Sequence, residues 1–329
     1  MAKTYRGTSG ADDVKQTNKD DWFNIITYAG DDTIRLTLTD TWVNAGADND
    51  TVRSVVEGGN RINLADGDDT YIGKGFANNN RHDEVYGGAG NDTMTVYTRQ
   101  SDYFGDGGND YMSSAGYWNW LDGGKGKDTI SYQAQDNDNY LQGWGVDLDL
   151  GAEVARTGQG RKERIFDFEN AEGTSYGDGI VGSGANNSLW GLGGADDIWG
   201  MKGNDKLYGG DGSDYLYGGN GSDQLTGGRG TDHMWGGAGK DDFIFAALNE
   251  MGKGNKADVI EDFEKGIDKI DLSGAGSFTY INKQAFNGVA GEIRFANGVL
   301  QGDVDGDGKA DFTIKVEDVN SLSNSDFIL

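Results

Sequence analysis

The chain has 329 residues, a formal net charge of -27, 57 Gly and neither Cys nor Pro, so disulfides and thiolate metal sites are excluded. An anion of this size is not expected to bind nucleic acid or to be drawn to an anionic membrane. The abundance of Gly and Asp favours turns over long helices, while 35% hydrophobic and 11% aromatic residues suffice for a narrow core, so we expect an ordered, turn-rich fold.

Residues 1–132 are predicted to form an irregular parallel β-solenoid with coils of about 18 residues. Loop aspartates recur at separations of 18, 19, 23, 18 and 18 residues, and each is followed two positions later by an apolar or aromatic side chain. The loops that start at Gly87 (GGAGNDTMT) and Gly123 (GGKGKDTIS) are the most regular copies. We predict a glycine–aspartate loop on one edge of each coil and ordinary turns on the other. The predicted calcium ligands are Asp32, Asp50, Asp69, Asp92, Asp110 and Asp128.

Residues 133–172 interrupt this period and are predicted to be a connecting segment. The alternation of apolar and acidic residues over 146–150 indicates a strand. A basic cluster follows, formed by Arg156, Arg161, Lys162 and Arg164. We expect the cluster to form salt bridges with neighbouring aspartate loops, and the alternative is that it grips an acidic polymer.

Residues 173–245 are predicted to form a parallel β-roll built from nonapeptides. From position 182 to position 244 the chain divides into seven of them without an insertion, for example GGDGSDYLY and GGNGSDQLT. Position six is Asp in every copy but the first, and position eight is always apolar. Two nonapeptides make one turn of such a roll, so every second loop stacks on the same edge. Asp196, Asp214 and Asp232 then line one edge, and Asp205, Asp223 and Asp241 line the other.

Calcium is the cation that this pattern favours. It takes about six to eight hard oxygens in a tolerant geometry, and loop carbonyls with short Asp carboxylates provide them. Without a cation, carboxylates stacked at about 4.8 Å would repel by roughly 3 kcal/mol per pair, so we predict that the metal-free roll is largely unfolded. The predicted ligands in and just after this region are Asp178, Gly191, Asp196, Gly200, Asp205, Gly209, Asp214, Gly218, Asp223, Gly227, Asp232, Gly236, Asp241 and Asp258.

The composition shifts again in residues 246–329, which contain DVIEDF, GIDKIDLSG and DGDGKADF. The spacing of Asp303, Asp305 and Asp307 resembles the start of an EF-hand loop. The Glu expected at loop position twelve is replaced by Ile314. The alternatives are a calcium site that Asp311 completes and an acidic turn without metal.

The nonapeptides follow G-G-x-G-x-D-x-U-x, the pattern of the calcium-binding RTX repeat, and the chain resembles secreted RTX proteins. Together with DVIEDF, GIDKIDLSG and DGDGKADF, the stretch from about 172 to 329 resembles the C-terminal domain of serralysin-type metalloproteases and the R modules of secreted mannuronan epimerases. This resemblance implies an RTX β-roll closed by a β-rich C-terminal cap in residues 246–329. It also implies export by type I secretion machinery through an uncleaved C-terminal signal, which the final Asp-Phe-Ile-Leu fits. We expect no cleaved leader and no membrane span, because no suitable apolar run is present.

No catalytic residue can be assigned. The metalloprotease relatives need H-E-x-x-H, and a chain whose histidines are His82 and His233 cannot form that zinc site. The epimerase relatives use a catalytic stretch with Pro and His, which a chain without Pro cannot contain. Residues 173–177 read G-x-S-x-G, yet they lead into the roll and not into a helix.

Position nine of the nonapeptides places Trp199, Tyr217 and Trp235 on one face of the roll. They form either a platform for sugar rings or a self-stacking ladder covered by the cap. We therefore predict a secreted, extracellular protein that folds on external Ca2+, holds several calcium ions, and binds an acidic polysaccharide or a cell surface. The alternatives are a polysaccharide lyase or epimerase acting on the first solenoid, and a subunit that self-assembles into a surface layer or filament.

Overall fold

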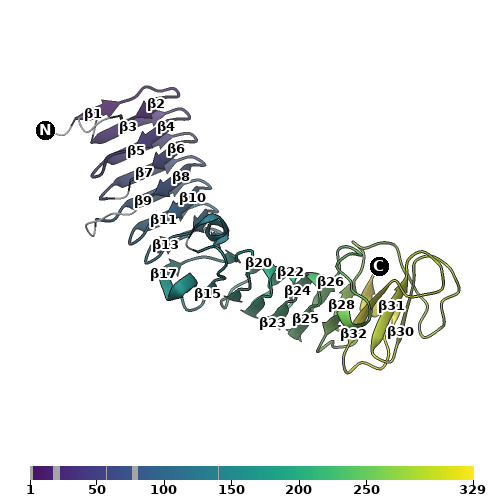
Figure 1. The fold of residues 1–329 in the computed structure, drawn as a ribbon. Coiled ribbons are helices and arrows are strands. Elements are labelled where there is room, and N and C mark those ends of the chain that lie inside the picture. Colours follow the sequence, from purple (N-terminus) through teal and green to yellow (C-terminus); the bar gives the residue numbers. More distant parts are fainter. Residues whose placement is uncertain (1–2, 18–22, 57, 76–80, 140) are drawn as a thin grey trace. The chain divides into compact units, whose positions relative to one another are not determined.

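The computed structural model describes residues 3–17, 23–56, 58–75, 81–139 and 141–329, and the chain divides into two compact units, Met1–Glu172 and Gly173–Leu329 (Figure 1). Both units are built from parallel strands, which confirms the all-β solenoid class. The helices in the described ranges are short 3-10 segments, η1 Gln133–Asn137, η2 Gly158–Gly160, η3 Gly254–Lys256 and η4 Asn324–Asp326. Among these residues, no helix has the length and apolar character needed to cross a membrane.

Unit 1 is a solenoid with two sheets. Within each sheet, every solenoid strand pairs in parallel with the next solenoid strand of that sheet along the chain. One sheet contains β1 Thr4–Arg6, β3 Asn24–Ala29, β5 Trp42–Ala47, β7 Arg61–Asp66, β9 Glu84–Ala89, β11 Asp102–Gly107, β13 Trp120–Asp122 and β17 Arg161–Phe166. The other contains β2 Asp13–Lys15, β4 Thr33–Leu36, β6 Thr51–Ser54, β8 Thr70–Lys74, β10 Thr93–Tyr97, β12 Tyr111–Ser114, β14 Thr129–Ser131 and β18 Asn170–Glu172.

Apolar side chains stack inside unit 1, because alternate residues of a strand point to the same face of a sheet. Each member is at most 2% exposed and contributes about 1.5–3 kcal/mol of burial. The first sheet supplies Ile25, Val43, Ile62, Val85, Tyr103, Leu121 and Ile165. The second supplies Val14, Ile34, Val52, Tyr71, Met94, Met112, Ile130 and Ala171.

The connecting segment adds an antiparallel hairpin to unit 1. Its strands are β15 Asp147–Asp149 and β16 Val154–Thr157, and β16 pairs with the edge of β17. The strand predicted over 146–150 is therefore present. In this register Arg156 lies opposite Lys162, and Val154 lies opposite Arg164. The outward face of the sheet thus carries a group of cations.

Unit 2 is also built from coils whose strands form two parallel sheets, and its coils have a more regular length. One sheet contains β19 Gly179–Val181, β21 Asp197–Lys202, β23 Tyr215–Gly221, β25 His233–Gly239 and β27 Asp258–Ile260. The other contains β20 Ser188–Gly194, β22 Lys206–Gly212, β24 Gln224–Gly230, β26 Asp242–Ile244, β28 Lys269–Asp271 and β33 Phe327–Ile328. The residues at position eight, from Leu189 to Phe243, are completely buried between the sheets.

The end of unit 2 is a β-rich cap. β32 Phe312–Val316 pairs in parallel with β27 and antiparallel with β31 Val299–Asp303, which pairs antiparallel with β30 Glu292–Ala296. β29 Thr279–Tyr280 lies parallel to β30. The change from parallel to antiparallel pairing ends the roll and closes its core with Phe295 and Phe312, which are at most 2% exposed.

The turns at the second edge of unit 1 are lined by a buried polar ladder, which the prediction of ordinary turns there did not include. Each backbone N–H at this corner donates to a side-chain oxygen of the next coil, at 2.9–3.1 Å. A buried N–H without a partner is strongly destabilising, and these oxygens supply the acceptor. The ladder consists of Thr41, Asn60, Asp83, Ser101 and Asn119, all at most 2% exposed.

Glu163 ends this polar ladder inside the solenoid. Its Oε1 accepts hydrogen bonds from Asn119 Nδ2 at 2.8 Å and Ser114 Oγ at 2.9 Å, and its Oε2 accepts one from the Tyr132 hydroxyl at 2.9 Å. Burial raises the pKa of this carboxyl to about 7, although the three hydrogen bonds lower it. The protonated form is therefore favoured in the folded state more than in the unfolded chain.

This burial predicts a pH-dependent contribution to stability. The folded pKa lies above the usual 4.5, so the stability that Glu163 contributes at low pH is lost as pH rises toward about 7. We expect Glu163→Gln to remove this loss, which amounts to about 3 kcal/mol. The measurement is urea unfolding at pH 5 and pH 8 in saturating calcium. The free energy of unfolding of the variant, relative to that of the natural protein, should increase from pH 5 to pH 8. A difference between the two proteins that is the same at both pH values would refute the assignment. Glu153→Gln, at an exposed position, is the control.

Candidate metal centres

A ladder of aspartates runs along one edge of unit 1. The backbone N–H of each member donates to Oδ1 of the equivalent aspartate in the next coil, at 2.6–2.8 Å. Its members are Asp12, Asp32, Asp50, Asp69, Asp92, Asp110 and Asp128. The last N–H donates to Glu169 Oε2 at 2.8 Å. All six predicted ligands of this unit thus lie on one line, which their irregular spacing in sequence does not disturb.

Unit 2 carries two such ladders, one on each edge. The first links Asp178, Asp196, Asp214, Asp232 and Asp258. The second links Asn187, Asp205, Asp223, Asp241 and Asp268, with N–H to Oδ1 distances of 2.7–3.0 Å. Sequence reasoning placed Asp258 among the ligands but missed Asp268. The signal available was its place two residues before Ile270, the same offset that every loop aspartate has from its buried residue.

Among the residues that the structure describes, the second carboxylate oxygen of most ladder aspartates has no hydrogen-bond partner. Oδ2 is buried and unpartnered in twelve of the ladder aspartates, Asp32, Asp50, Asp69, Asp92, Asp110, Asp128, Asp196, Asp205, Asp214, Asp223, Asp232 and Asp241. Burial, and next the neighbouring carboxylates, raise the pKa of Asp196 to about 8, while burial raises that of Asp214 to about 6. Rows of buried oxygens without a partner call for a cation.

The glycine that opens each loop lets a carboxylate oxygen and a carbonyl oxygen approach its backbone closely. A Cβ at Gly209 would lie 2.4 Å from Asp214 Oδ2 and 2.5 Å from the Gly227 carbonyl oxygen. The same holds at Gly191, where the distances to Asp196 Oδ2 and the Gly209 oxygen are 2.2 and 2.7 Å. A side chain would displace these oxygens, whereas glycine lets them converge from two coils.

These donors fit calcium. They are hard oxygens, carboxylate and carbonyl, without nitrogen or sulfur, and this is the set that Ca2+ prefers. The Asp side chains and the carbonyls of Gly191, Gly200, Gly209, Gly218, Gly227 and Gly236 are the groups that would hold the ion. When bound, the ion supplies the positive charge that compensates the stacked carboxylates.

Two predicted sites differ from this arrangement. Asp178 Oδ2 accepts a hydrogen bond from the backbone N–H of Thr174 at 2.6 Å, so its carboxylate is engaged at the first loop of unit 2. In the cap, carboxylate oxygens of Asp303, Asp305 and Asp311 lie within 4.8 Å of one another. Asp307 stands apart from them, and its Oδ2 pairs with Lys309 Nζ at 2.9 Å. The structure therefore groups three of the four cap aspartates.

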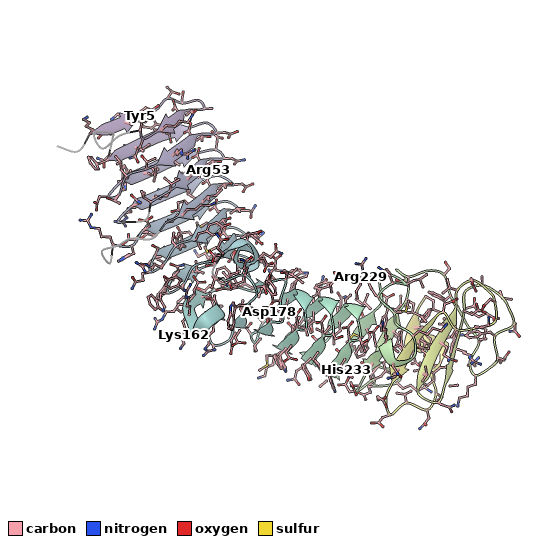
Figure 2. All side chains as sticks on the ribbon, viewed as in Figure 1. Tyr5, Arg53, Lys162, Asp178, Arg229 and His233 are labelled. Carbon is pink, nitrogen blue, oxygen red and sulfur yellow. The ribbon has the colours of Figure 1, made fainter. Side chains whose placement is uncertain are left out.

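The aromatic row of unit 2 is a stacked ladder on the outer face of β21, β23 and β25. The ring centroids of Trp199 and Tyr217 are 5.5 Å apart, and those of Tyr217 and Trp235 are 4.5 Å apart, with interplanar angles of 5° and 13°. All three rings are half-buried. In the neighbouring column lies His233, which is labelled in Figure 2. His233 stacks on Tyr215 at 5.1 Å, and its Nδ1 lies 2.7 Å from Glu261 Oε1.

The basic cluster does not pair with the aspartate loops, so that expectation was wrong. Within the described part of the chain, none of its four cations forms an ion pair. Instead the Arg161 guanidinium lies 4.3 Å from the centroid of the Tyr117 ring, and that of Arg164 lies 5.6 Å from the Trp120 ring. The reason is that β17 and its hairpin hold these side chains on a sheet face, whereas the aspartates line the edge.

Comparison with known proteins agrees with this geometry. Residues 191–329 match the family described as the peptidase M10 serralysin C terminal. Residues 104–138 and 172–207 match the RTX calcium-binding nonapeptide repeat. Among curated proteins none matches the chain. A solved structure that matches is the AlgE6R3 subunit from the Azotobacter vinelandii mannuronan C5-epimerase, with 25% identity, a TM-score of 0.32, and coverage of 47% of this chain and 79% of that one.

The fold and the aspartate loops define a calcium-binding parallel β-roll protein. More particularly, the chain carries segments that match RTX calcium-binding repeats and a serralysin-type C-terminal region, and these repeats imply that it binds calcium. The resemblance inferred from the nonapeptides is confirmed.

Proposed function

We propose that this protein is secreted, folds on extracellular calcium, and binds a polysaccharide or a cell surface through the ladder Trp199, Tyr217 and Trp235. The observation that carries the proposal is the half-buried stack of these rings. The stacked rings form a continuous apolar strip along the sheet, against which the apolar face of a sugar ring can pack at little conformational entropy loss. The aspartate ladders on the two edges of unit 2, when they hold calcium, would fix the distance between successive rings of the stack.

The export part of the proposal concerns residues 246–329, which act as cap and secretion signal after the roll 173–245. It is supported by the serralysin C-terminal match. Co-expression with a type I exporter tests it. The full chain should reach the medium and a chain without residues 246–329 should stay in the cell, while equal export of both would refute the signal.

A glycan-binding screen with the calcium-loaded protein tests the binding part. We expect Trp199→Ala and Trp235→Ala to weaken binding of the best glycan at least about fivefold, because each removes a packing surface worth about 1 kcal/mol or more. Trp190→Ala is the matched control, since Trp190 stacks with Tyr208 in the other sheet. Absence of binding to every glycan would refute the function. Release of unsaturated or shortened products would instead show a lyase or hydrolase.

A further inference from the structure

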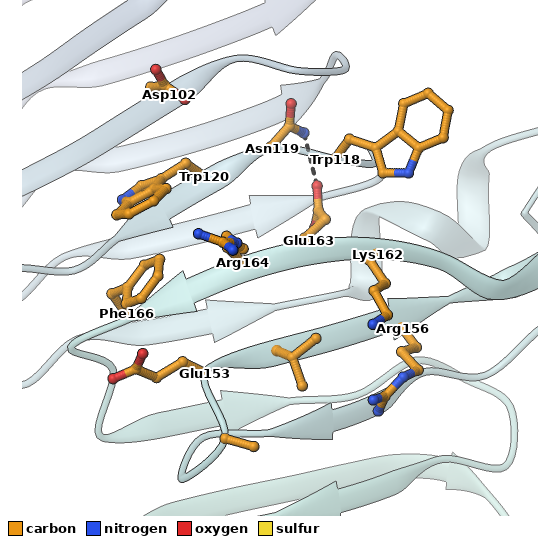
Figure 3. A pocket seen from close by; sticks show the side chains of 12 residues that line it. Asp102, Trp118, Asn119, Trp120, Glu153, Arg156, Lys162, Glu163, Arg164 and Phe166 are labelled. Carbon is orange, nitrogen blue, oxygen red and sulfur yellow. Dashed lines mark hydrogen bonds between the residues drawn. The ribbon is translucent and has the colours of Figure 1, made fainter.

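We propose that the outward sheet face formed by Arg156, Lys162, Arg164, Trp118 and Trp120 in unit 1 is a binding site for an anionic sugar chain, one that carries carboxylates. This inference rests on the proposed polysaccharide-binding function and adds a second, charge-selective site to it. The site lies on β13, β17 and β16 and lines a cavity of about 750 Å³ (Figure 3).

The register of these strands brings the five side chains into two rows. Trp120 is paired with Arg164, which is paired with Val154 on the hairpin. In the other row, the backbone N–H of Trp118 donates to the Lys162 carbonyl, and Lys162 is paired with Arg156. Neighbouring strands are about 4.8 Å apart, and alternate residues on one strand about 6.6 Å apart. The three cations therefore form a compact triangle beside two indoles.

The charge of the three cations is not compensated by the acids around them. None of the three forms an ion pair in the described ranges of the chain. The acids facing the cavity are Asp102, whose Oδ2 is 3.9 Å from His82 Nε2, and Glu153 on the hairpin turn. Asp147 lies opposite Arg156 on β15, and Glu163 points into the core toward Asn119. In a protein with a net charge of -27, an unpaired basic face is a local exception.

Of the two indoles beside the cations, Trp118 is held out toward solvent and Trp120 is half-buried. Trp118 is 57% exposed, and its backbone has φ of 62°, the left-handed region that bulky residues rarely adopt. Such strain persists where the surrounding fold imposes it, and it is concentrated at binding sites. Trp120 stacks on Phe166 at 4.2 Å between ring centroids, which fixes its ring as a flat platform. The site thus offers both stacking surfaces and positive charge.

A uronate chain satisfies both features better than a nucleic acid does. Each uronate residue combines a ring face, which stacks on an indole, with one carboxylate, which a guanidinium binds in bidentate fashion. Double-stranded DNA carries about one charge per 1.7 Å of its axis, much more densely than one charge per sugar residue, and the surrounding anionic surface of this protein repels such a chain beyond the short reach of three cations. The ligand that this face fits best is therefore a sugar chain that carries one carboxylate on each ring.

The test is titration calorimetry of the full, calcium-loaded chain with a hexamer of galacturonic acid and, separately, with neutral cellohexaose, at one free calcium concentration. We expect the triple variant Arg156→Gln, Lys162→Gln, Arg164→Gln to bind the galacturonate hexamer at least tenfold more weakly and cellohexaose unchanged. Trp118→Ala should also weaken the hexamer. Arg53→Gln is the control, because Arg53 is an exposed cation on the other sheet (Figure 2). Raising NaCl to about 0.5 M should reduce hexamer binding to the natural protein.

Each outcome separates this site from the aromatic ladder of unit 2. Hexamer binding that the triple variant keeps but Trp199→Ala loses overturns the inference and leaves the proposed function intact. Binding of neither sugar by the natural protein refutes both. Tighter binding of a single-stranded DNA of equal charge, with the same loss in the triple variant, would identify a nucleic-acid site and overturn the sugar assignment. If the triple variant fails to fold, Arg156→Glu at an exposed strand position provides the same comparison with one charge reversed.

Discussion

Adding EGTA to the purified protein is expected to abolish its cooperative melting transition and most of its β-sheet circular dichroism signal. The reason is the stacked carboxylates, twelve of which have a buried Oδ2 without a hydrogen-bond partner. Each stacked pair repels by roughly 3 kcal/mol at an effective dielectric near 20, and a few such pairs exceed the usual margin of about 5–15 kcal/mol that keeps a domain folded. Removal of calcium leaves this repulsion uncompensated.

Far-ultraviolet circular dichroism and calorimetry during a calcium titration measure the effect. Excess calcium should restore the signal, whereas magnesium at the same concentration should restore much less, since it prefers a rigid octahedral shell and keeps its water. A chain that melts at the same temperature with and without EGTA would show that backbone pairing alone holds the solenoid, and the metal assignment would then fail.

Replacing one loop glycine should have the largest effect of any single substitution. We expect Gly209→Ala to raise the calcium concentration at the folding midpoint at least tenfold and to destabilise unit 2 by about 3 kcal/mol or more. The added Cβ would lie 2.4 Å from Asp214 Oδ2 and 2.5 Å from the Gly227 carbonyl oxygen, so it collides with two calcium-ligand candidates and forces them to move. The backbone of Gly209 is not in the left-handed region, so the effect arises from displaced ligand oxygens and not from φ.

Gly184→Ala is the matched control for this substitution. Gly184 is also a loop glycine of unit 2 with no positive φ, but a Cβ there would meet no atom within 4 Å. Its calcium titration should overlay that of the natural protein. If both variants shift the midpoint equally, loss of glycine flexibility explains the result, and displacement of the two oxygens beside Gly209 does not.

The repeat pattern determined the solenoid, its inward residues and the aspartate ladders. Asp214 lies 18 residues after Asp196 and 18 before Asp232, and a strict period leaves one way to bring every apolar position eight to the same interior. In unit 1, Asp69 and Asp92 are 23 residues apart and still adjacent, because the extra residues leave the loop aspartate and its inward neighbour in phase. Local periodicity is visible in one dimension, so these features could be predicted without coordinates.

Only the tertiary structure shows which side chains line the second edge of unit 1 and which lie on its outer sheet face. Thr41, Asn60 and Asp83 recur at the same intervals as the loop aspartates, but their side chains differ in type and share only the ability to accept a hydrogen bond. The unpaired state of Lys162 and Arg164 likewise follows from the hairpin that β16 adds to β17. The polar ladder and the basic face both depend on which backbone groups and charges lie opposite each other on paired strands. Long-range strand pairing sets these neighbours, and composition and spacing do not encode it.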